Sequence, residues 1–214
     1  MSGTGADAQA CPPPLTPSDD LAMRARLGAS HVAIVGCGGL GSNAAAMLVR
    51  SGVGKLTLVD FDTVEEDNLN RQLFFRDQIG MLKTDALADT LRRIEPDVDL
   101  MLVRECLDEE NLLGVVEGAD VVIEAVDRAD VKAMIANVLC TDAPDLPLVS
   151  TSGLAGIDSA NEIVCERVGE NFYLVGDLHS DVRSGLPLLA SRVMVAAAHQ
   201  AHAATRILLG YEEP

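Results

Sequence analysis

The sequence predicts an α/β domain built on a doubly wound, mostly parallel sheet, with a C-terminal extension of antiparallel strands and a long helix. Three observations predict this fold. Apolar, β-branched segments alternate with segments of helical spacing, a glycine-rich turn follows the first strand, and the alternation stops after Gly153. The chain has 214 residues, of which 48% are apolar, so a sizeable core and one domain with a small extension are expected.

The elements before Gly153 are predicted from composition and periodicity. Residues 1–20 are rich in Gly, Pro, Ser and Asp, which predicts a flexible leader before a domain at residues 21–214. Apolar residues at helical spacing predict helices at 21–27, 42–51, 78–94 (ended by Pro96), 108–116 and 129–139. Apolar runs rich in β-branched residues predict strands at 31–35, 55–61, 98–103, 119–126 and 146–150.

The pattern changes beyond Gly153. Residues 162–168 and 172–176 are short strand-like runs on either side of a turn, and residues 187–209 form an Ala-rich helical segment. The polar loop between the last strand and the last helix is either a plain connection or a segment that closes over a peptide tail.

Charge and cysteine content exclude several classes of function. The chain has 16 Lys and Arg against 33 Asp and Glu, a net charge of −17, so nucleic acid is not an expected partner. No run reaches the roughly 18 apolar residues of a membrane span, and the first 20 residues lack the pattern of a signal peptide. The five cysteines include no CxxC pair, so neither a disulfide framework nor structural zinc is expected, and the expected location is cytoplasmic.

The glycine-rich turn predicts a nucleotide site. Gly36, Gly38 and Gly41 satisfy the G-x-G-x-x-G spacing typical of Rossmann-like folds, between a predicted strand and a predicted helix. Such glycines let the backbone approach phosphate, and the helix N-terminus offers unpaired N–H groups. Asp60, at the end of the second strand and 19 residues after Gly41, is placed to meet a ribose hydroxyl. Alone, the motif does not distinguish NAD, a flavin cofactor and ATP.

A pair of cations favours ATP. Arg71 lies in the string NLNRQ, and Lys83 follows twelve residues later. An Arg and a Lys near a glycine turn suit a triphosphate better than a nicotinamide dinucleotide, whose site has no use for two cations beyond its phosphates.

A second carboxylate is expected at the same edge of the sheet. Asp127 follows strand 119–126, and ligands of open parallel sheets bind outside the carboxyl ends of the strands. A triphosphate needs a divalent ion, so we expect Asp127 to hold Mg²⁺, although it could instead be the N-cap of helix 129–139. Glu124, inside the strand, is either buried with a partner or turned towards the site.

Four strings together resemble the ThiF/MoeB family, the ubiquitin-activating-enzyme-like adenylyltransferases. They are VAIVGCGGLGSN, LTLVDFDTVEEDNLNRQ, IGMLK and ADVVIEAVD, within about residues 30–130. The later strings STSGLAG and YLVGD and the Ala-rich helix are most similar to the short ThiF-type branch. The resemblance implies ATP-dependent adenylylation of the C-terminal glycine of a small ubiquitin-like sulfur carrier protein that ends in Gly-Gly. It also implies release of pyrophosphate, in sulfur transfer for thiamin or a related cofactor.

The resemblance implies roles for individual residues. By motif position, Gly39 and Gly41 lie under the phosphates, Asp60 binds the ribose and Asp127 coordinates Mg²⁺. Three polar residues are implied to contact the phosphates: Asn68, Arg71 and Lys83. Arg71 and Lys83 would act in catalysis by reducing the repulsion between carboxylate and triphosphate, and Asp127 would act in catalysis through the Mg²⁺ that it coordinates.

The resemblance also implies a homodimer, and the sequence departs from the family pattern in places. Arg24 or Arg26 would serve the partner's site. Arg128 stands where Asn commonly follows the magnesium aspartate, and the CxxC zinc pairs of many relatives are missing. No obvious cysteine is placed for a thioester or persulfide, because Cys37 lies inside the glycine turn and Cys165 in a predicted strand, where a structural role is expected.

Two other functions are alternatives for a chain with this nucleotide turn. An NAD-dependent oxidoreductase would need a catalytic base and a substrate domain, for which the sequence offers no space. A non-catalytic subunit that binds ubiquitin-like proteins would have no need of the retained Asp60, Arg71, Lys83 and Asp127.

Overall fold

The computed structural model describes residue 14, residues 19–181 and residues 184–214. Nearly all of the expected leader, residues 1–13 and 15–18, lies outside the described residues. Within the described ranges, no helix is both long and apolar enough to cross a membrane.

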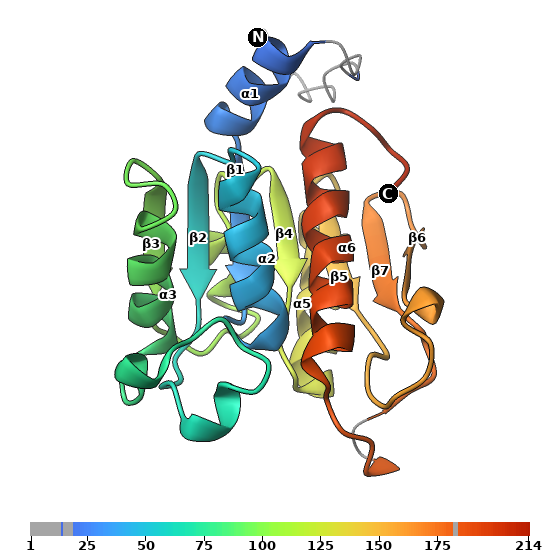
Figure 1. Cartoon of the computed structure of the whole chain (residues 1–214). Coiled ribbons are helices and arrows are strands. Elements are labelled where there is room, and N and C mark those ends of the chain that lie inside the picture. The colour runs from blue at the N-terminus through green and yellow to red at the C-terminus, as the bar shows by residue number, and fades with distance from the viewer. Residues whose placement is uncertain (1–13, 15–18, 182–183) are drawn as a thin grey trace, which may run out of the picture.

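The described part of the chain forms one seven-stranded sheet with helices on both faces (Figure 1). Its strands are β1 (His31–Val35), β2 (Lys55–Val59), β3 (Asp99–Val103), β4 (Val121–Glu124), β5 (Leu148–Thr151), β6 (Val164–Arg167) and β7 (Phe172–Gly176). Its α-helices are α1 (Asp20–Ala29), α2 (Gly39–Arg50), α3 (Lys83–Arg92), α4 (Leu112–Val115), α5 (Ala129–Asp142) and α6 (Ala190–Leu208).

The sheet topology confirms the predicted fold class. The strand order is β3-β2-β1-β4-β5-β7-β6, with β6 antiparallel to β7 and the other neighbouring pairs parallel. The winding changes direction between β1 and β4, which are parallel neighbours. This arrangement opens a crevice outside the carboxyl ends of the two strands, where ligands of such sheets bind.

Strand β1 is buried on both faces, which explains its continuous apolar run. Val32 and Ile34 belong to the core under α2, α3 and α6, whereas Ala33 and Val35 belong to the core under α4 and α5. Figure 1 shows α2 and α6 side by side in front of the sheet and α5 behind it. Helix α1 lies at the amino end of the strands, opposite the edge where β1 and β4 end.

Several predicted boundaries differ from those of the structure, and two of the differences matter for the site. The helix expected at 78–94 begins only at Lys83, because Gly80 has a φ of 88° and Leu82 is extended with a ψ of 137°. Conversely, α2 begins at Gly39, three residues before the expected start, so Gly39 and Gly41 lie in its first turn.

Candidate active site

The glycine turn packs between the carboxyl ends of β1 and β4. Gly36 has a φ of +96°, and a Cβ there would lie 2.7 Å from the Ala125 carbonyl oxygen. A Cβ at Gly41 would lie 1.8 Å from the Gly36 carbonyl oxygen. At Gly38 the nearest atom to a Cβ, Nε2 of Gln72, is 3.7 Å away, an ordinary contact. Gly36 and Gly41 are therefore required by packing, whereas a Cβ at Gly38 would make only an ordinary contact.

Asp60 connects the end of β2 to this turn. Its Oδ2 accepts a hydrogen bond from the backbone N–H of Cys37 at 2.7 Å, and its Oδ1 accepts one from the N–H of Asp62 at 2.9 Å. Burial raises the pKa of Asp60 above its usual value, while these two hydrogen bonds and the charge of Lys83 oppose the rise. Each carboxylate oxygen retains a free lone pair for a further donor.

The loop that carries Arg71 is tied to the first turn of α2 by two residues that the sequence analysis did not single out. Ser42 Oγ accepts from the N–H of Leu73 at 3.0 Å, and Asn43 Nδ2 donates to the Arg71 carbonyl at 3.1 Å. A Cβ at Gly39 would lie 3.5 Å from Arg71 Cγ. The signal was present in the string GSN directly after the glycines.

Eight polar residues line one cavity of about 230 Å³ beside this loop: Asp62, Thr63, Glu65, Asn68, Arg71, Gln72, Lys83 and Asp127. Four of them are site residues predicted from the sequence, although they are separated by up to 59 positions. Asp60 does not line the cavity, but it accepts a hydrogen bond from the backbone N–H of Asp62, which does line it. The structure thus gathers the predicted polar residues around one cavity next to the glycine turn.

The two cations differ in their surroundings. Lys83 opens α3 as a buried residue, and its Nζ lies 2.7 Å from Asp62 Oδ2, on a carboxylate that is about half exposed. Arg71 donates from Nη1 to the Asp67 carbonyl and to Asn70 Oδ1, at 3.2 and 2.7 Å. Neither of those acceptors is charged, so the guanidinium charge remains available to an anion in the cavity.

Asn68 lines the cavity while completing the local fold. Its Oδ1 accepts from the N–H of Glu65 at 3.0 Å, which caps the 3₁₀ helix Glu66–Asn68. Its amide nitrogen is the group left to face a phosphate.

Asp127 follows β4 as an exposed residue of the cavity lining. The alternative that it caps the following helix is wrong: the N-cap of α5 is Arg128, and no side chain caps that end. Arg128 itself is exposed and paired with Asp130 at 2.5 Å.

Glu124 is buried with partners and is not turned into the cavity. Its side chain is fully buried, and Lys132 Nζ lies 2.8 Å from Oε1. Ser150 Oγ donates to Oε2 at 2.5 Å, and the N–H of Val126 donates to Oε1 at 2.7 Å. Glu124 thus fixes the turn that presents Asp127.

The two cysteines considered in the sequence are poor nucleophiles. Cys37 is fully buried, and desolvation raises the pKa of its thiol well above the usual value. Burial raises the pKa of Cys165, on β6, to about 11.

The cavity fits a nucleoside triphosphate by the character of its donors. Its lining includes two cations, Arg71 and Lys83, and the N-terminus of α2 lies beside it, where a Cβ on Gly39 would be 3.5 Å from Arg71 Cγ. No group of three or more His, Cys, Asp or Glu side chains within the described ranges forms a metal site. Asp127 is the exposed carboxylate in the lining that could hold a magnesium ion together with phosphate oxygens and water.

Comparison with known proteins now decides the family, because the ThiF family profile matches residues 16–214. The chain belongs to the ThiF family. It is 34% identical over 192 residues to the molybdopterin-synthase adenylyltransferase of Escherichia coli, a match that covers 86% of this chain and 75% of that protein.

Two further proteins are similar to this chain, over different shares of their own length. The chain is 42% identical over 124 residues to ubiquitin-like modifier-activating enzyme 5 of Oryza sativa subsp. japonica, but the match covers 52% of this chain and only 29% of the rice protein. The ThiF fold is also seen in E. coli tRNA N6-threonylcarbamoyladenosine dehydratase in complex with ATP. That structure is 25% identical with a TM-score of 0.71, over 85% of this chain and 88% of that one.

Proposed function

We propose that this ThiF-family chain is an ATP-dependent adenylyltransferase whose substrate is the C-terminal glycine carboxylate of a small ubiquitin-like sulfur carrier protein. The observation that carries the proposal is the single cavity beside the glycine turn, in which Arg71, Lys83 and Asp127 meet. Two cations in one cavity, beside the N-terminus of α2, suit the meeting of a carboxylate with a triphosphate, because both reactants are anions.

The proposed step is a displacement at the α-phosphorus of ATP. A carboxylate oxygen of the terminal glycine bonds to that phosphorus, the bond to the bridging oxygen of the β-phosphate breaks, and pyrophosphate leaves. The glycine turn lies under the phosphates, and Asp60 binds the ribose through its free lone pairs. Arg71, Lys83 and Asn68 hold phosphate oxygens and offset the repulsion between the reactants. Asp127 would hold Mg²⁺, which would supply further positive charge at the phosphates.

The acceptor is proposed to be a protein and not RNA. The E. coli relative at 34% identity is named as an adenylyltransferase for molybdopterin synthase, whereas the dehydratase is named for a tRNA nucleoside. The net charge of −17 opposes binding of a polyanion, which favours a small carrier protein over tRNA. A carrier for thiamin or a related sulfur-containing cofactor, with a Gly-Gly end, fits the proposal.

The active form in this proposal is a homodimer. Helix α1 lies at the opposite end of the sheet from the cavity (Figure 1), so an arginine of α1 serves only a partner's site. Arg26 donates to the Leu209 carbonyl at 2.9 Å, whereas Arg24 is exposed and paired with Asp20. Arg24 is therefore the freer candidate.

Carrier-dependent exchange of labelled pyrophosphate into ATP tests the function. Arg71→Ala is expected to lower the exchange by at least about 100-fold, the order found when one group that stabilises transition-state charge is removed. Its melting temperature should be unchanged, because the side chain bonds only to neighbours within four residues. Arg76→Ala is the matched control, since Arg76 is an exposed arginine of the same region, paired with Glu66 outside the cavity lining.

Two results would contradict the proposal. One is wild-type protein that shows no exchange with any Gly-Gly-ended carrier, or that binds NAD(H) in preference to ATP. The other is an Arg71→Ala variant as active as Arg76→Ala. The homodimer is tested by mixing the Arg71→Ala protein with an Arg24→Ala protein. In a mixed dimer, one site combines the intact Arg71 of one chain with the intact Arg24 of the other, so pyrophosphate exchange should be restored. Failure to restore it would exclude Arg24 from a shared site.

A further inference from the structure

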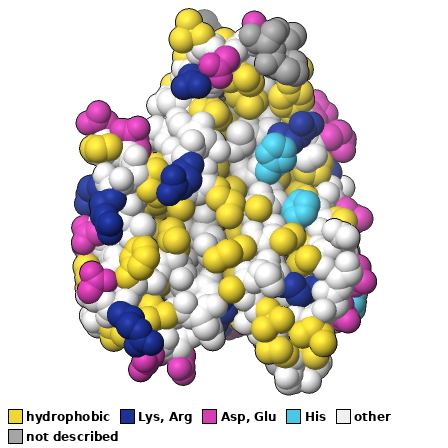
Figure 2. Space-filling view, in the orientation of Figure 1, with side chains coloured by type: hydrophobic (Ala, Val, Ile, Leu, Met, Phe, Trp, Pro, Cys, Tyr) yellow, Lys and Arg dark blue, Asp and Glu magenta, His cyan; other side chains and the backbone are white. Residues whose placement is uncertain are grey.

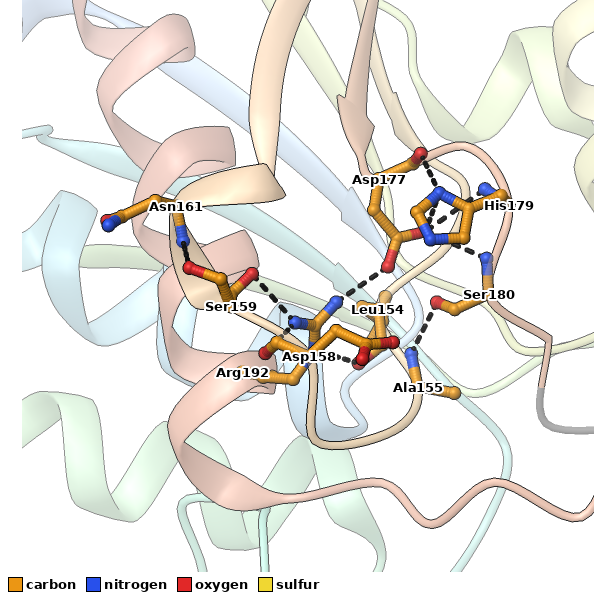
Figure 3. A network of polar contacts seen from close by, with 9 residues as sticks. All are labelled: Leu154, Ala155, Asp158, Ser159, Asn161, Asp177, His179, Ser180 and Arg192. Atoms are coloured by element: carbon orange, nitrogen blue, oxygen red, sulfur yellow. Dashed lines mark hydrogen bonds and ion pairs between the residues drawn. The ribbon is translucent and has the colours of Figure 1, made fainter.

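A buried ion pair lies at the carboxyl edge of the sheet, outside the cavity lining (Figure 3). Arg192 in the first turn of α6 and Asp177 directly after β7 approach to 2.6 Å between Nη2 and Oδ2. Their side chains are 3% and 0% exposed. A buried pair gives little net stability by itself, so its position calls for another reason.

The pair joins two loops to α6. The β5 loop is defined here as residues 152–160 and the β7 loop as residues 176–181. In the β5 loop, the Arg192 guanidinium donates to the carbonyl oxygens of Leu154, Asp158 and Ser159 (Figure 3).

Asp177 organises the β7 loop in the same way. Its Oδ1 accepts from the N–H groups of His179 and Ser180 at 3.0 and 2.8 Å. Ser180 Oγ then accepts from the N–H of Ala155 at 2.9 Å, which closes the network between the loops. Burial alone would raise the pKa of Asp177, but the hydrogen bonds from the two N–H groups outweigh it and lower the pKa below its usual value. The carboxylate is therefore charged at neutral pH.

The glycines of STSGLAG and YLVGD are explained by this contact. A Cβ at Gly153, which has a φ of +81°, would lie 2.2 Å from Asp177 Oδ1. A Cβ at Gly176, which has a φ of +147°, would lie 1.8 Å from the Ser152 carbonyl oxygen. Only glycine lets the two loops approach so closely.

The β5 loop and the β7 loop lie at the part of the carboxyl edge of the sheet that does not line the nucleotide cavity. The cavity is lined by segments that follow β2 and β4, and no residue of either loop contributes to it. Strands β5 and β7 lie on the other side of β4. Val193, next to Arg192, packs on the nucleotide turn, since a Cβ at Gly39 would lie 2.9 Å from its Cγ1.

This half of the edge also carries exposed apolar side chains. Leu178 has a φ of 63°, the only positive φ at a described non-glycine residue, and it is half exposed. Ile157 is 81% exposed, and Leu186 and Leu189 are also partly exposed. Figure 2 shows hydrophobic side chains gathered at this end, below the first turn of α6. The strained backbone of Leu178 is held in place by its two neighbours in the chain. Asp177 is paired with Arg192, and the N–H of His179 donates to Asp177.

We propose that Arg192 and Asp177 are a positioning pair for the adenylation step, and this inference rests on the proposed function. The pair holds the β5 loop and the β7 loop as the approach path for the extended C-terminal tail of the carrier, with Leu178 as a contact for that tail. The carboxylate must reach the α-phosphorus from the side opposite the leaving pyrophosphate. With the nucleotide in the cavity, the β5–β7 half of the edge is the side that remains.

The test separates use of the carrier from binding of ATP. The probe is a small ubiquitin-like protein ending in Gly-Gly, with the same protein lacking both glycines as its blank. In Arg192→Met, the KM for the carrier in pyrophosphate exchange should rise at least about tenfold, because loops that are no longer held in place lose contacts that bind the carrier tail. The Kd for a fluorescent ATP analogue should stay within about twofold, because the nucleotide turn keeps its own supports.

A second variant avoids the cost of leaving a buried charge unpaired. Leu178→Gly suits the positive φ and removes only the exposed side chain, so its melting temperature should not fall. Its KM for the carrier should still rise. Leu139→Ala, a core change in α5 away from both loops, serves as the control for loss of stability and should leave that KM unchanged.

The outcomes are distinguishable. The inference is overturned, while the proposed function stands, if the KM for the carrier is unchanged in Leu178→Gly. The same holds if Arg192→Met lowers only the melting temperature, as Leu139→Ala does, and leaves that KM unchanged. A wild-type chain without carrier-dependent exchange overturns both.

Discussion

Replacing Lys132 with Met is expected to destabilise the domain by about 3 kcal/mol, because it leaves a buried carboxylate without its cation. Lys132 Nζ lies 2.8 and 2.9 Å from the two oxygens of Glu124, whose side chain is fully buried on β4. Breaking such a pair costs roughly 3–5 kcal/mol. The low end applies, because Lys132 is 25% exposed and the hydrogen bonds from Ser150 and Val126 remain.

The double variant Lys132→Met with Glu124→Gln should recover most of that loss. The neutral amide oxygen still accepts a hydrogen bond, and no buried charge is left alone. For a domain of this size, about 3 kcal/mol corresponds to a fall in melting temperature of roughly 6–12 °C in the single variant. Because Glu124 fixes the turn before Asp127, the single variant should also lose pyrophosphate exchange.

The chain contains no Trp, so urea unfolding is best followed by far-UV circular dichroism. A single variant that loses less than about 1 kcal/mol would refute the reasoning, since that is the range of an exposed pair. So would a double variant no more stable than the single one, because the loss would then come from packing and not from charge.

Two further predictions concern the nucleotide turn and the thiols. Gly41→Ala should abolish ATP binding, because its Cβ would lie 1.8 Å from the Gly36 carbonyl oxygen, whereas Gly38→Ala, with 3.7 Å to its nearest atom, should keep the fold. Iodoacetamide at pH 8 should alkylate Cys165 about 100-fold more slowly than an equally accessible thiol of ordinary pKa. The reason is that raising its pKa from 9.0 to about 11 lowers the thiolate fraction by about that factor. Its labelling should accelerate as the pH rises towards 11, while the buried Cys37 should stay unlabelled until unfolding.

Each of these two predictions has a result that would contradict it. A folded Gly41→Ala that binds a fluorescent ATP analogue as tightly as wild type would exclude the packing argument. For the thiols, the exposed Cys106 and Cys140 should label first, as mapped by mass spectrometry, and Cys11 lies outside the described residues. Rapid labelling of Cys37 in the native protein would show that the glycine turn opens.

Much of the fold was predictable because its signals are local. The alternation of helical and β-branched segments predicted the parallel sheet, and the strand pair after Gly153 predicted the antiparallel edge. Element boundaries were less predictable: at the start of α3, for example, the helical spacing of apolar residues hid the break at Gly80 and Leu82. Periodicity reports which face is apolar, but a positive φ at one glycine interrupts a helix without changing that pattern.

Four of the eight residues that line the cavity were singled out from the sequence, but the hydrogen bonds and ion pairs within the site were not. The glycine turn, Arg71, Lys83 and Asp127 were found from motifs, because each follows a recognisable element. That Asp62 pairs with Lys83 was not, since no spacing rule links residues 21 positions apart. Pairing across such a distance depends on which side chains the packed sheet brings together.

By itself, then, the amino-acid order determined the α/β class, the nucleotide turn and the polar residues that follow β2 and β4. Only the tertiary structure decided that Glu124 is held by Lys132 and not turned into the cavity, and that Arg192 joins the two loops beyond β4. The physical reason is range. Turns and amphipathic periods are set by neighbouring residues, whereas a buried charge takes its partner from whichever strand or helix packs against it.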